Sequence, residues 1–224
     1  MGRLPAILCL HGGGANANIF HIQTIRIQRA LADQFEFVFL DAPHETGPGP
    51  GVLPFFEGCT PYLRWTSETG QVSMPEKTRD LLVKTQEEQK KKDGRGFVGV
   101  MGFSQGGRVA AGLLLTHQLT KDTDAGEKGL RFGVFLNSVC PPMAYEVEGS
   151  DLTTKIEFPS LHVIGKKDPW KDSGRRLFEE NFYEKQAVLL EFDVAHRLPT
   201  QQEDTAKLTA EILRMHRNTS AFDA

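Results

Sequence analysis

One serine of this chain lies between two glycines at a predicted turn from a strand into a helix. The segment Gly102–Gly106 reads G-F-S-Q-G; it follows an apolar run at 97–101 and precedes a helical pattern at 109–115. Such a turn strains the backbone of the serine and leaves no room for a Cβ on the flanking glycines. It would lift the Ser104 hydroxyl above the sheet, beside amide groups that favour negative charge. The chemistry this predicts is attack of Ser104 on a carbonyl carbon.

A serine nucleophile needs a base within hydrogen-bond reach and a carboxylate that holds the base in the right tautomer. Asp168 and His196 follow Ser104 in the order Ser, Asp, His that α/β-hydrolases use, and each comes just after a predicted strand. Two other carboxylates compete with Asp168. We expect Asp172 to cap a helix and Asp193 to serve a local turn.

Six further histidines are candidates for the base, and we expect all six to be structural or solvated. They are His11, His21, His44, His117, His162 and His216. His196 differs from them because it lies in the loop between the last predicted strand and the last predicted helix, which is where this fold places its base.

A glycine triplet follows the first predicted strand, in the run His11-Gly12-Gly13-Gly14. Glycines leave the backbone free to present an N–H group to a ligand, and loops of this type form oxyanion holes in lipases and esterases. We therefore expect the backbone N–H groups of Gly13 and Gln105 to hold the oxyanion. The alternative is a plain flexible loop, and which glycine would donate is left open.

A long segment at about 44–75 is rich in glycine and proline and has little periodicity. Long irregular segments in compact domains are often functional. This one carries four aromatic side chains that could line a substrate pocket: Phe55, Phe56, Tyr62 and Trp65. They could equally pin the segment to the body of the protein.

The remaining chain alternates strands with helices. Strands are predicted at 6–10, 35–40, 97–101, 132–136, 160–164 and 187–192, and helices at 19–34, 75–92, after Ser104, around 177–182 and at 200–217. A charged surface loop is predicted at 121–128, an irregular loop at 143–158, and a frayed tail at 218–224. This pattern indicates an α/β fold with a mostly parallel sheet of about six strands and helices on both faces. In such sheets the working residues lie at the carboxyl ends of the strands.

Composition narrows the class of protein. The 224 residues are 39% hydrophobic and 25% charged with a net charge of −3, which suits a single domain over 1–224 and gives no electrostatic footprint for nucleic acid. No apolar run has the roughly 18 residues of a membrane helix. Three cysteines, Cys9, Cys59 and Cys140, do not make a disulfide framework. Cys9 and Cys140 lie in or beside apolar runs, and we expect both to be buried thiols. We expect a cytoplasmic protein without metal or cofactor.

Four segments together resemble the fungal family of small serine hydrolases, which includes polyketide-releasing thioesterases and the ovarian-tumour-associated serine hydrolase. They are Leu10-His11-Gly12, the run M-G-F-S-Q-G-G at 101–107, Gly165-Lys166-Lys167-Asp168, and His196-x-x-Pro199. The family often has a glycine before its catalytic histidine, where this chain has Val194-Ala195.

The resemblance implies an α/β-hydrolase fold with Ser104, Asp168 and His196 as a catalytic triad. It also implies hydrolysis of an acyl ester or thioester. One form of this expectation is a polyketide-type acyl chain bound to an acyl carrier protein, released as part of secondary metabolism. The residues leave other functions open: a general carboxylesterase, a carbon–carbon hydrolase, a peptidase, or a non-catalytic member of the fold that binds a small molecule.

Overall fold

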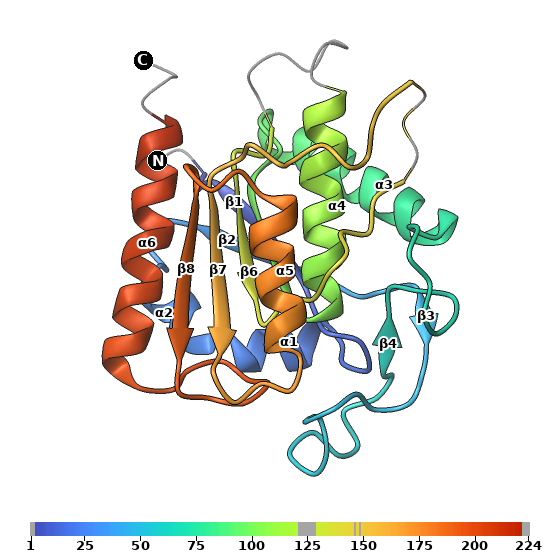
Figure 1. Ribbon diagram of the computed structural model, residues 1–224, viewed down its shortest axis with the longest axis vertical. Coiled ribbons are helices and arrows are strands. Elements are labelled where there is room, and N and C mark those ends of the chain that lie inside the picture. The colour runs from blue at the N-terminus through green and yellow to red at the C-terminus, as the bar shows by residue number, and fades with distance from the viewer. Residues whose placement is uncertain (1–2, 121–128, 146, 148, 221–224) are drawn as a thin grey trace.

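A computed structural model describes residues 3–120, 129–145, 147 and 149–220. The predicted loop at 121–128 and the end of the predicted tail, 221–224, lie outside this part of the chain. Six strands form one sheet in the order β2-β1-β5-β6-β7-β8, and every neighbouring pair is parallel (Figure 1). They are β1 (Ala6–Leu10), β2 (Glu36–Leu40), β5 (Phe97–Phe103), β6 (Phe132–Leu136), β7 (Ser160–Gly165) and β8 (Ala187–Phe192). The six predicted strands are confirmed, with small shifts at their ends.

The four inner strands are buried along their whole length, whereas the edge strands β2 and β8 are mostly half-buried. Continuous apolar runs are what a parallel sheet covered on both faces requires. Side chains alternate between the faces, so β1 sends Leu8 into one apolar cluster and Ile7 and Cys9 into the other. The sheet therefore lies between two separate cores.

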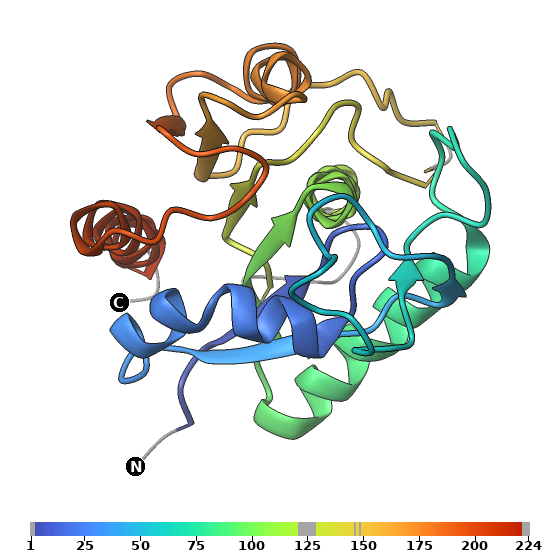
Figure 2. The same cartoon turned by 90° about the horizontal axis from the view of Figure 1, so that it is seen from below.

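Six helices cover the two faces. They are α1 (Ala17–Gln23), α2 (Ile25–Ala30), α3 (Glu76–Asp93), α4 (Gln105–Leu119), α5 (Lys171–Asn181) and α6 (Gln202–Ser220). Buried residues of α3, α4 and α5 join the cluster that contains Leu8, and those of α1, α2 and α6 join the cluster that contains Ile7. Figure 2 shows α6 beside α1 and α2, with α4 and α5 across the sheet from them. The predicted α/β fold with helices on both faces is confirmed.

The single helix predicted at 19–34 was wrong, because the chain forms two short helices with a break at Thr24. The buried Thr24 hydroxyl donates to the carbonyl oxygen of Phe20 at 2.7 Å. Threonine side chains that bond to the preceding turn compete with the helix and bend it. The break turns α2 toward α6, which it contacts.

Two other helix boundaries differ from the prediction. Phe182 does not belong to the face of α5 but follows its end, where it is fully buried and bridges to Ile156. Helix α6 runs from Gln202 to Ser220, so residues 218–220, predicted as tail, are helical.

The segment at 44–75 is not wholly irregular. It contains two short antiparallel strands, β3 (His44–Glu45) and β4 (Leu63–Arg64). Leu63 also pairs with Ala15, so this segment is attached to the glycine loop after β1. In Figure 1 the segment lies at the end of the molecule toward which the arrowheads of β7 and β8 point, which is where the carboxyl ends of the strands meet.

Candidate active site

Ser104 occupies a strained turn between β5 and α4. Its backbone has φ 51° and ψ −116°, and among the described residues Asn137 is the other non-glycine residue with positive φ. A Cβ on Gly102 would lie 2.4 Å from the carbonyl oxygen of Gly106, and one on Gly106 would lie 2.2 Å from that of Leu10. The flanking glycines are therefore required by close backbone packing. Strain of this kind persists where the surrounding structure holds it, often at functional sites.

The His196 imidazole and the Asp168 carboxylate form a close pair. Nδ1 of His196 donates to Oδ2 of Asp168 at 2.7 Å, and Oδ1 accepts the backbone N–H of Trp170 at 2.8 Å. Asp168 is only 3% exposed. A buried carboxylate on Nδ1 holds the imidazole in the tautomer whose Nε2 is free to accept a proton.

The loop that carries His196 is held by the side chain of Asn137. Its Nδ2 donates to the carbonyl oxygen of Arg197 at 2.9 Å, and its Oδ1 accepts the N–H of Gly165 at 2.8 Å. Rings of Phe103 and Trp170 lie 4.9 Å and 4.6 Å from the imidazole, measured between centroids. Sequence reasoning missed Asn137 as a positioning residue; its place directly after β6 was the available signal.

Ser104 and His196 line one cavity of about 590 Å³. Within the described part of the chain, no hydrogen bond joins the Ser104 hydroxyl to the imidazole. Such bonds are often long without substrate and tighten when it binds. Besides the serine turn and the loop of His196, the walls come from the glycine loop, the end of α1, the 44–75 segment, the loop after β6 and the start of α5. They include Gly12, Gly13, Ala15, Pro50, Val52, Thr69, Val139, Cys140, Trp170 and Ser173.

The backbone N–H groups of the glycine loop differ in their hydrogen bonding. Gly14 donates its N–H to the carbonyl oxygen of Leu63 at 2.8 Å, so this group is already used. The N–H of Gly13 has no partner among the described residues, and a Cβ there would lie 3.1 Å from Oε1 of Gln105. Gln105 is the first residue of α4, and N–H groups of a first helical turn lack acceptors within the helix.

The Gln105 side chain has a different task from its backbone. Its Oε1 accepts the backbone N–H of Trp65 at 2.8 Å, and its Nε2 donates to the Thr66 hydroxyl at 3.2 Å. The fully buried Trp65 donates its ring N–H to the carbonyl oxygen of His11 at 2.7 Å. These bonds fasten the 44–75 segment to both the glycine loop and the serine turn.

The four aromatic residues of that segment do not line the cavity over Ser104, in contrast to the expectation. Phe55 is 86% exposed, and Trp65 lies in the core beneath. Phe56 and Tyr62 pack against the small cluster around Ile19. The aromatic rings thus pin the segment to the body, and its proline, glycine, valine and threonine residues face the cavity instead.

The remaining candidate groups lie elsewhere. Burial lowers the pKa of His11 to about 4; its Nδ1 donates to the carbonyl oxygen of Gly12 at 2.8 Å and its Nε2 accepts the N–H of Ala42. On the surface, Oδ2 of Asp193 accepts a hydrogen bond from Nζ of Lys167 at 2.8 Å. Asp172 lies in the first turn of α5 rather than at its cap. Cys9 is buried as expected, whereas Cys140 is only half-buried.

The described residues contain no group of three or more histidine, cysteine, aspartate or glutamate side chains that could hold a metal ion. None of their helices is long and apolar enough to cross a membrane.

Known serine hydrolases are similar in sequence to this chain over most of its length. A family model described as "Serine hydrolase (FSH1)" matches residues 1–208. The chain belongs to this serine hydrolase family. It is 35% identical to Thioesterase FSL2 of Gibberella zeae, over 95% of this chain and 92% of that protein. It is 34% identical to Esterase FUS5 of Gibberella fujikuroi, over 96% of this chain and 88% of that protein.

Solved structures carry the same fold. The chain superimposes on acyl-protein thioesterase 2 of Zea mays with a TM-score of 0.61, over 96% of this chain and 95% of that one. Their sequences are 17% identical, so the likeness concerns the fold. The expected resemblance to small serine hydrolases with an α/β-hydrolase fold is confirmed, and the chain is an enzyme of the esterase and thioesterase type.

Proposed function

We propose that residues 1–224 form one catalytic domain that hydrolyses acyl esters or thioesters with Ser104, His196 and Asp168 as its triad. The observation that carries this proposal is the 2.7 Å bond between His196 and the buried Asp168, in the cavity that the strained Ser104 also lines. A carboxylate, an imidazole and a serine at a sharp strand-to-helix turn are the parts that acyl transfer requires.

The reaction begins when Nε2 of His196 takes the Ser104 hydroxyl proton and the serine oxygen bonds to the carbonyl carbon. The carbonyl electron pair moves to oxygen, and the N–H groups of Gly13 and Gln105 stabilise that negative charge. Donors of this kind are each worth roughly 3 to 4 kcal/mol of barrier. Collapse breaks the bond to the leaving oxygen or sulfur, which takes the proton from His196, and leaves an acyl-enzyme.

Water completes the cycle. His196 takes one proton from the water molecule while the water oxygen attacks the acyl carbon. This attack forms the second tetrahedral intermediate. Its collapse breaks the bond to Ser104, returns the proton to the serine oxygen and releases the carboxylic acid. Asp168 stabilises the imidazolium in both halves.

The substrate we propose is a small acyl ester or thioester. The names of two relatives, a thioesterase and an esterase, support both bond types. A cavity of about 590 Å³ is within the roughly 300 to 1,000 Å³ range of small-molecule sites. Its apolar walls suit an acyl chain. We extend the proposal to a polyketide-type chain delivered by an acyl carrier protein in the cytoplasm, as part of secondary metabolism.

The test is hydrolysis of one acyl chain presented as a thioester and as an oxyester. Wild type, Ser104→Ala and the remote control Ser150→Ala are compared. We expect Ser104→Ala to lower kcat by at least about 10⁴-fold on both substrates, and the control to behave as wild type. A thioester preference beyond its intrinsic lability supports the carrier version, whereas equal rates identify a carboxylesterase. Full activity of Ser104→Ala would refute the triad.

A further inference from the structure

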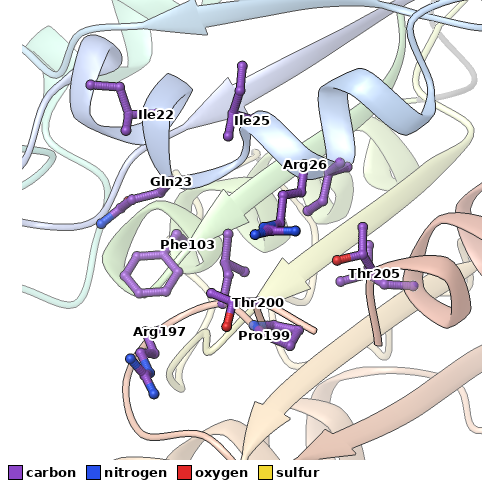
Figure 3. Close-up of a pocket in the computed structure, with 12 residues that line it drawn as sticks. Ile22, Gln23, Ile25, Arg26, Phe103, Arg197, Pro199, Thr200 and Thr205 are labelled. Carbon is purple, nitrogen blue, oxygen red and sulfur yellow. The ribbon is translucent and has the colours of Figure 1, made fainter. Parts of the chain in front are cut away.

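A second cavity, of about 260 Å³, shares part of its lining with the first. Figure 3 shows the residues that line it. It is enclosed by α1 and α2 on one side and by the segment after His196 with the start of α6 on the other. Its walls are mostly apolar and include Ile22, Ile25, Ile27, Leu198, Pro199 and Leu208. The mechanism above makes no use of this space.

The two cavities adjoin each other. Gln23, Phe103 and Arg197 line both of them, so these three residues form their shared boundary. The boundary is next to the base, because Phe103 packs 4.9 Å from the His196 ring and Arg197 follows His196 in the chain. The proposed oxyanion donors Gly13 and Gln105 line the larger cavity and not the second one.

We infer that the second cavity, here named the leaving-group compartment, receives the alcohol or thiol that the reaction releases. The inference rests on the proposed function. His196 has to give its proton to the leaving atom, so the leaving group must lie on the imidazole side of the reacting carbon. The compartment adjoins that side of the larger cavity, and the acyl chain occupies the larger cavity itself.

The walls define the body of the leaving group. An apolar cavity of about 150 Å³ takes up benzene, so 260 Å³ accommodates a ring with a short arm or a branched alkyl group.

Two arginines set the charge that the compartment accepts. Figure 3 shows Arg26 reaching from α2 across the cavity toward Thr200, with Arg197 on the opposite wall. Neither guanidinium has an ion-pair partner in the described part of the chain. Two uncompensated positive charges repel a cation at short range. The compartment therefore fits a neutral or anionic leaving group with an apolar body.

The test keeps the acyl group constant and varies the alcohol. Methyl butyrate, 3,3-dimethylbutyl butyrate and butyrylcholine are compared; the last two have the same shape and differ in charge. We expect kcat/KM for the dimethylbutyl ester to exceed that for the choline ester by at least tenfold. Arg26→Gln, a change at an exposed residue, should narrow this difference.

A filling substitution then tests the space itself. Thr200 is exposed, so Thr200→Trp can block the compartment without disturbing the core. We expect the ratio of kcat/KM for dimethylbutyl over methyl ester to fall at least tenfold, since each buried methylene changes binding about fourfold. The control, Val83→Trp on the surface of α3, should leave this ratio unchanged. Octanoyl and butyryl methyl esters measure the acyl preference in parallel.

The outcomes separate this inference from the proposed function. If wild type hydrolyses methyl butyrate through Ser104 but Thr200→Trp leaves the alcohol ratio unchanged, the triad stands and the compartment assignment falls. If Thr200→Trp alters the octanoyl-to-butyryl ratio instead, the cavity holds the acyl arm and the assignment is again wrong. If no ester is hydrolysed, binding of 3,3-dimethylbutanol to Ser104→Ala decides: saturable binding that Thr200→Trp removes supports the compartment, and no binding overturns it.

Discussion

The Asn137 side chain donates a hydrogen bond at 2.9 Å to the carbonyl oxygen of Arg197, the residue after the proposed base. The same amide accepts the N–H of Gly165 at 2.8 Å, three residues before Asp168. One side chain therefore links the two loops that carry His196 and Asp168. Asn137 also has a positive φ of 44°, a conformation that asparagine tolerates better than most residues.

Removal of this amide should slow catalysis more than it weakens substrate binding. We expect Asn137→Gly, which keeps the backbone conformation accessible, to lower kcat by about 10- to 100-fold with little change in KM, because small displacements of reacting groups are costly. Asn137→Asp keeps the acceptor for Gly165 and loses the donor to Arg197, so its kcat should be intermediate. Steady-state kinetics on a short acyl ester measures both. A change confined to the melting temperature would assign Asn137 a purely structural role.

Three glycines of the glycine loop and the 44–75 segment should respond very differently to replacement by alanine. Gly14 has φ +74°, and a Cβ there would lie 2.1 Å from the backbone nitrogen of Gly49. Gly51 has φ +77° with open space around it, and Gly47 has neither constraint. We expect Gly47→Ala to be neutral or slightly stabilising, Gly51→Ala to cost about 1 kcal/mol, and Gly14→Ala to cost well over 2 kcal/mol. Urea unfolding of the three variants measures this order, and equal costs would contradict it.

The sheet could be predicted because its signal is local. Each inner strand is a continuous apolar run, and a parallel sheet covered on both faces requires this pattern. The serine turn was equally readable, because the glycines at 102 and 106 are dictated by close backbone packing. The order of Ser104, Asp168 and His196 along the chain was sufficient to name the pair that the structure brings to 2.7 Å.

Features that depend on contacts distant in the sequence could not be predicted in the same way. The helix break at Thr24 follows from one hydroxyl that competes with the backbone, and a periodicity pattern does not contain this information. The type of the aromatic residues in the 44–75 segment does not decide between lining a pocket and pinning the segment to the body. Trp65 is held in the core by bonds to His11 and Gln105, partners 54 and 40 residues away.

The Gln105 side chain should control the order of the 44–75 segment. Gln105→Ala leaves the backbone N–H in place but removes the acceptor of the Trp65 amide, which is then unpaired. An unpaired buried donor costs about 1 to 3 kcal/mol. We expect faster cleavage of the segment by a protease at low concentration and a higher KM, while kcat changes less. Gln71→Ala, which removes bonds within the exposed turn at Ser67, is the matched control. Equal protection of Gln105→Ala and wild type would exclude the anchoring role.

The buried His162 should make the protein less stable in mild acid. Burial lowers its pKa from 6.5 to about 3, while the unfolded chain titrates near the ordinary value. Between these limits the unfolded state binds more protons, so the free energy of unfolding falls as the pH decreases from about 6.5 toward 3, and is unaffected above 6.5. One histidine contributes a slope of about 1.4 kcal/mol per pH unit. His11, with a pKa of about 4, acts in the same direction.

Substitution of His162 isolates its share of this pH dependence. The ring stacks on Phe135 at 4.8 Å and contacts Phe182, so His162→Phe keeps an aromatic side chain in the same apolar site. Urea unfolding of this variant at intervals between pH 4.5 and 7.5 measures how its free energy of unfolding changes with pH. Below about pH 6.5 this change should be smaller than that of wild type by the equivalent of about one bound proton. His21→Phe, a change at an exposed residue, is the control and should retain the wild-type slope. Identical slopes for wild type and His162→Phe would show that His162 is protonated in the folded protein, contrary to its burial.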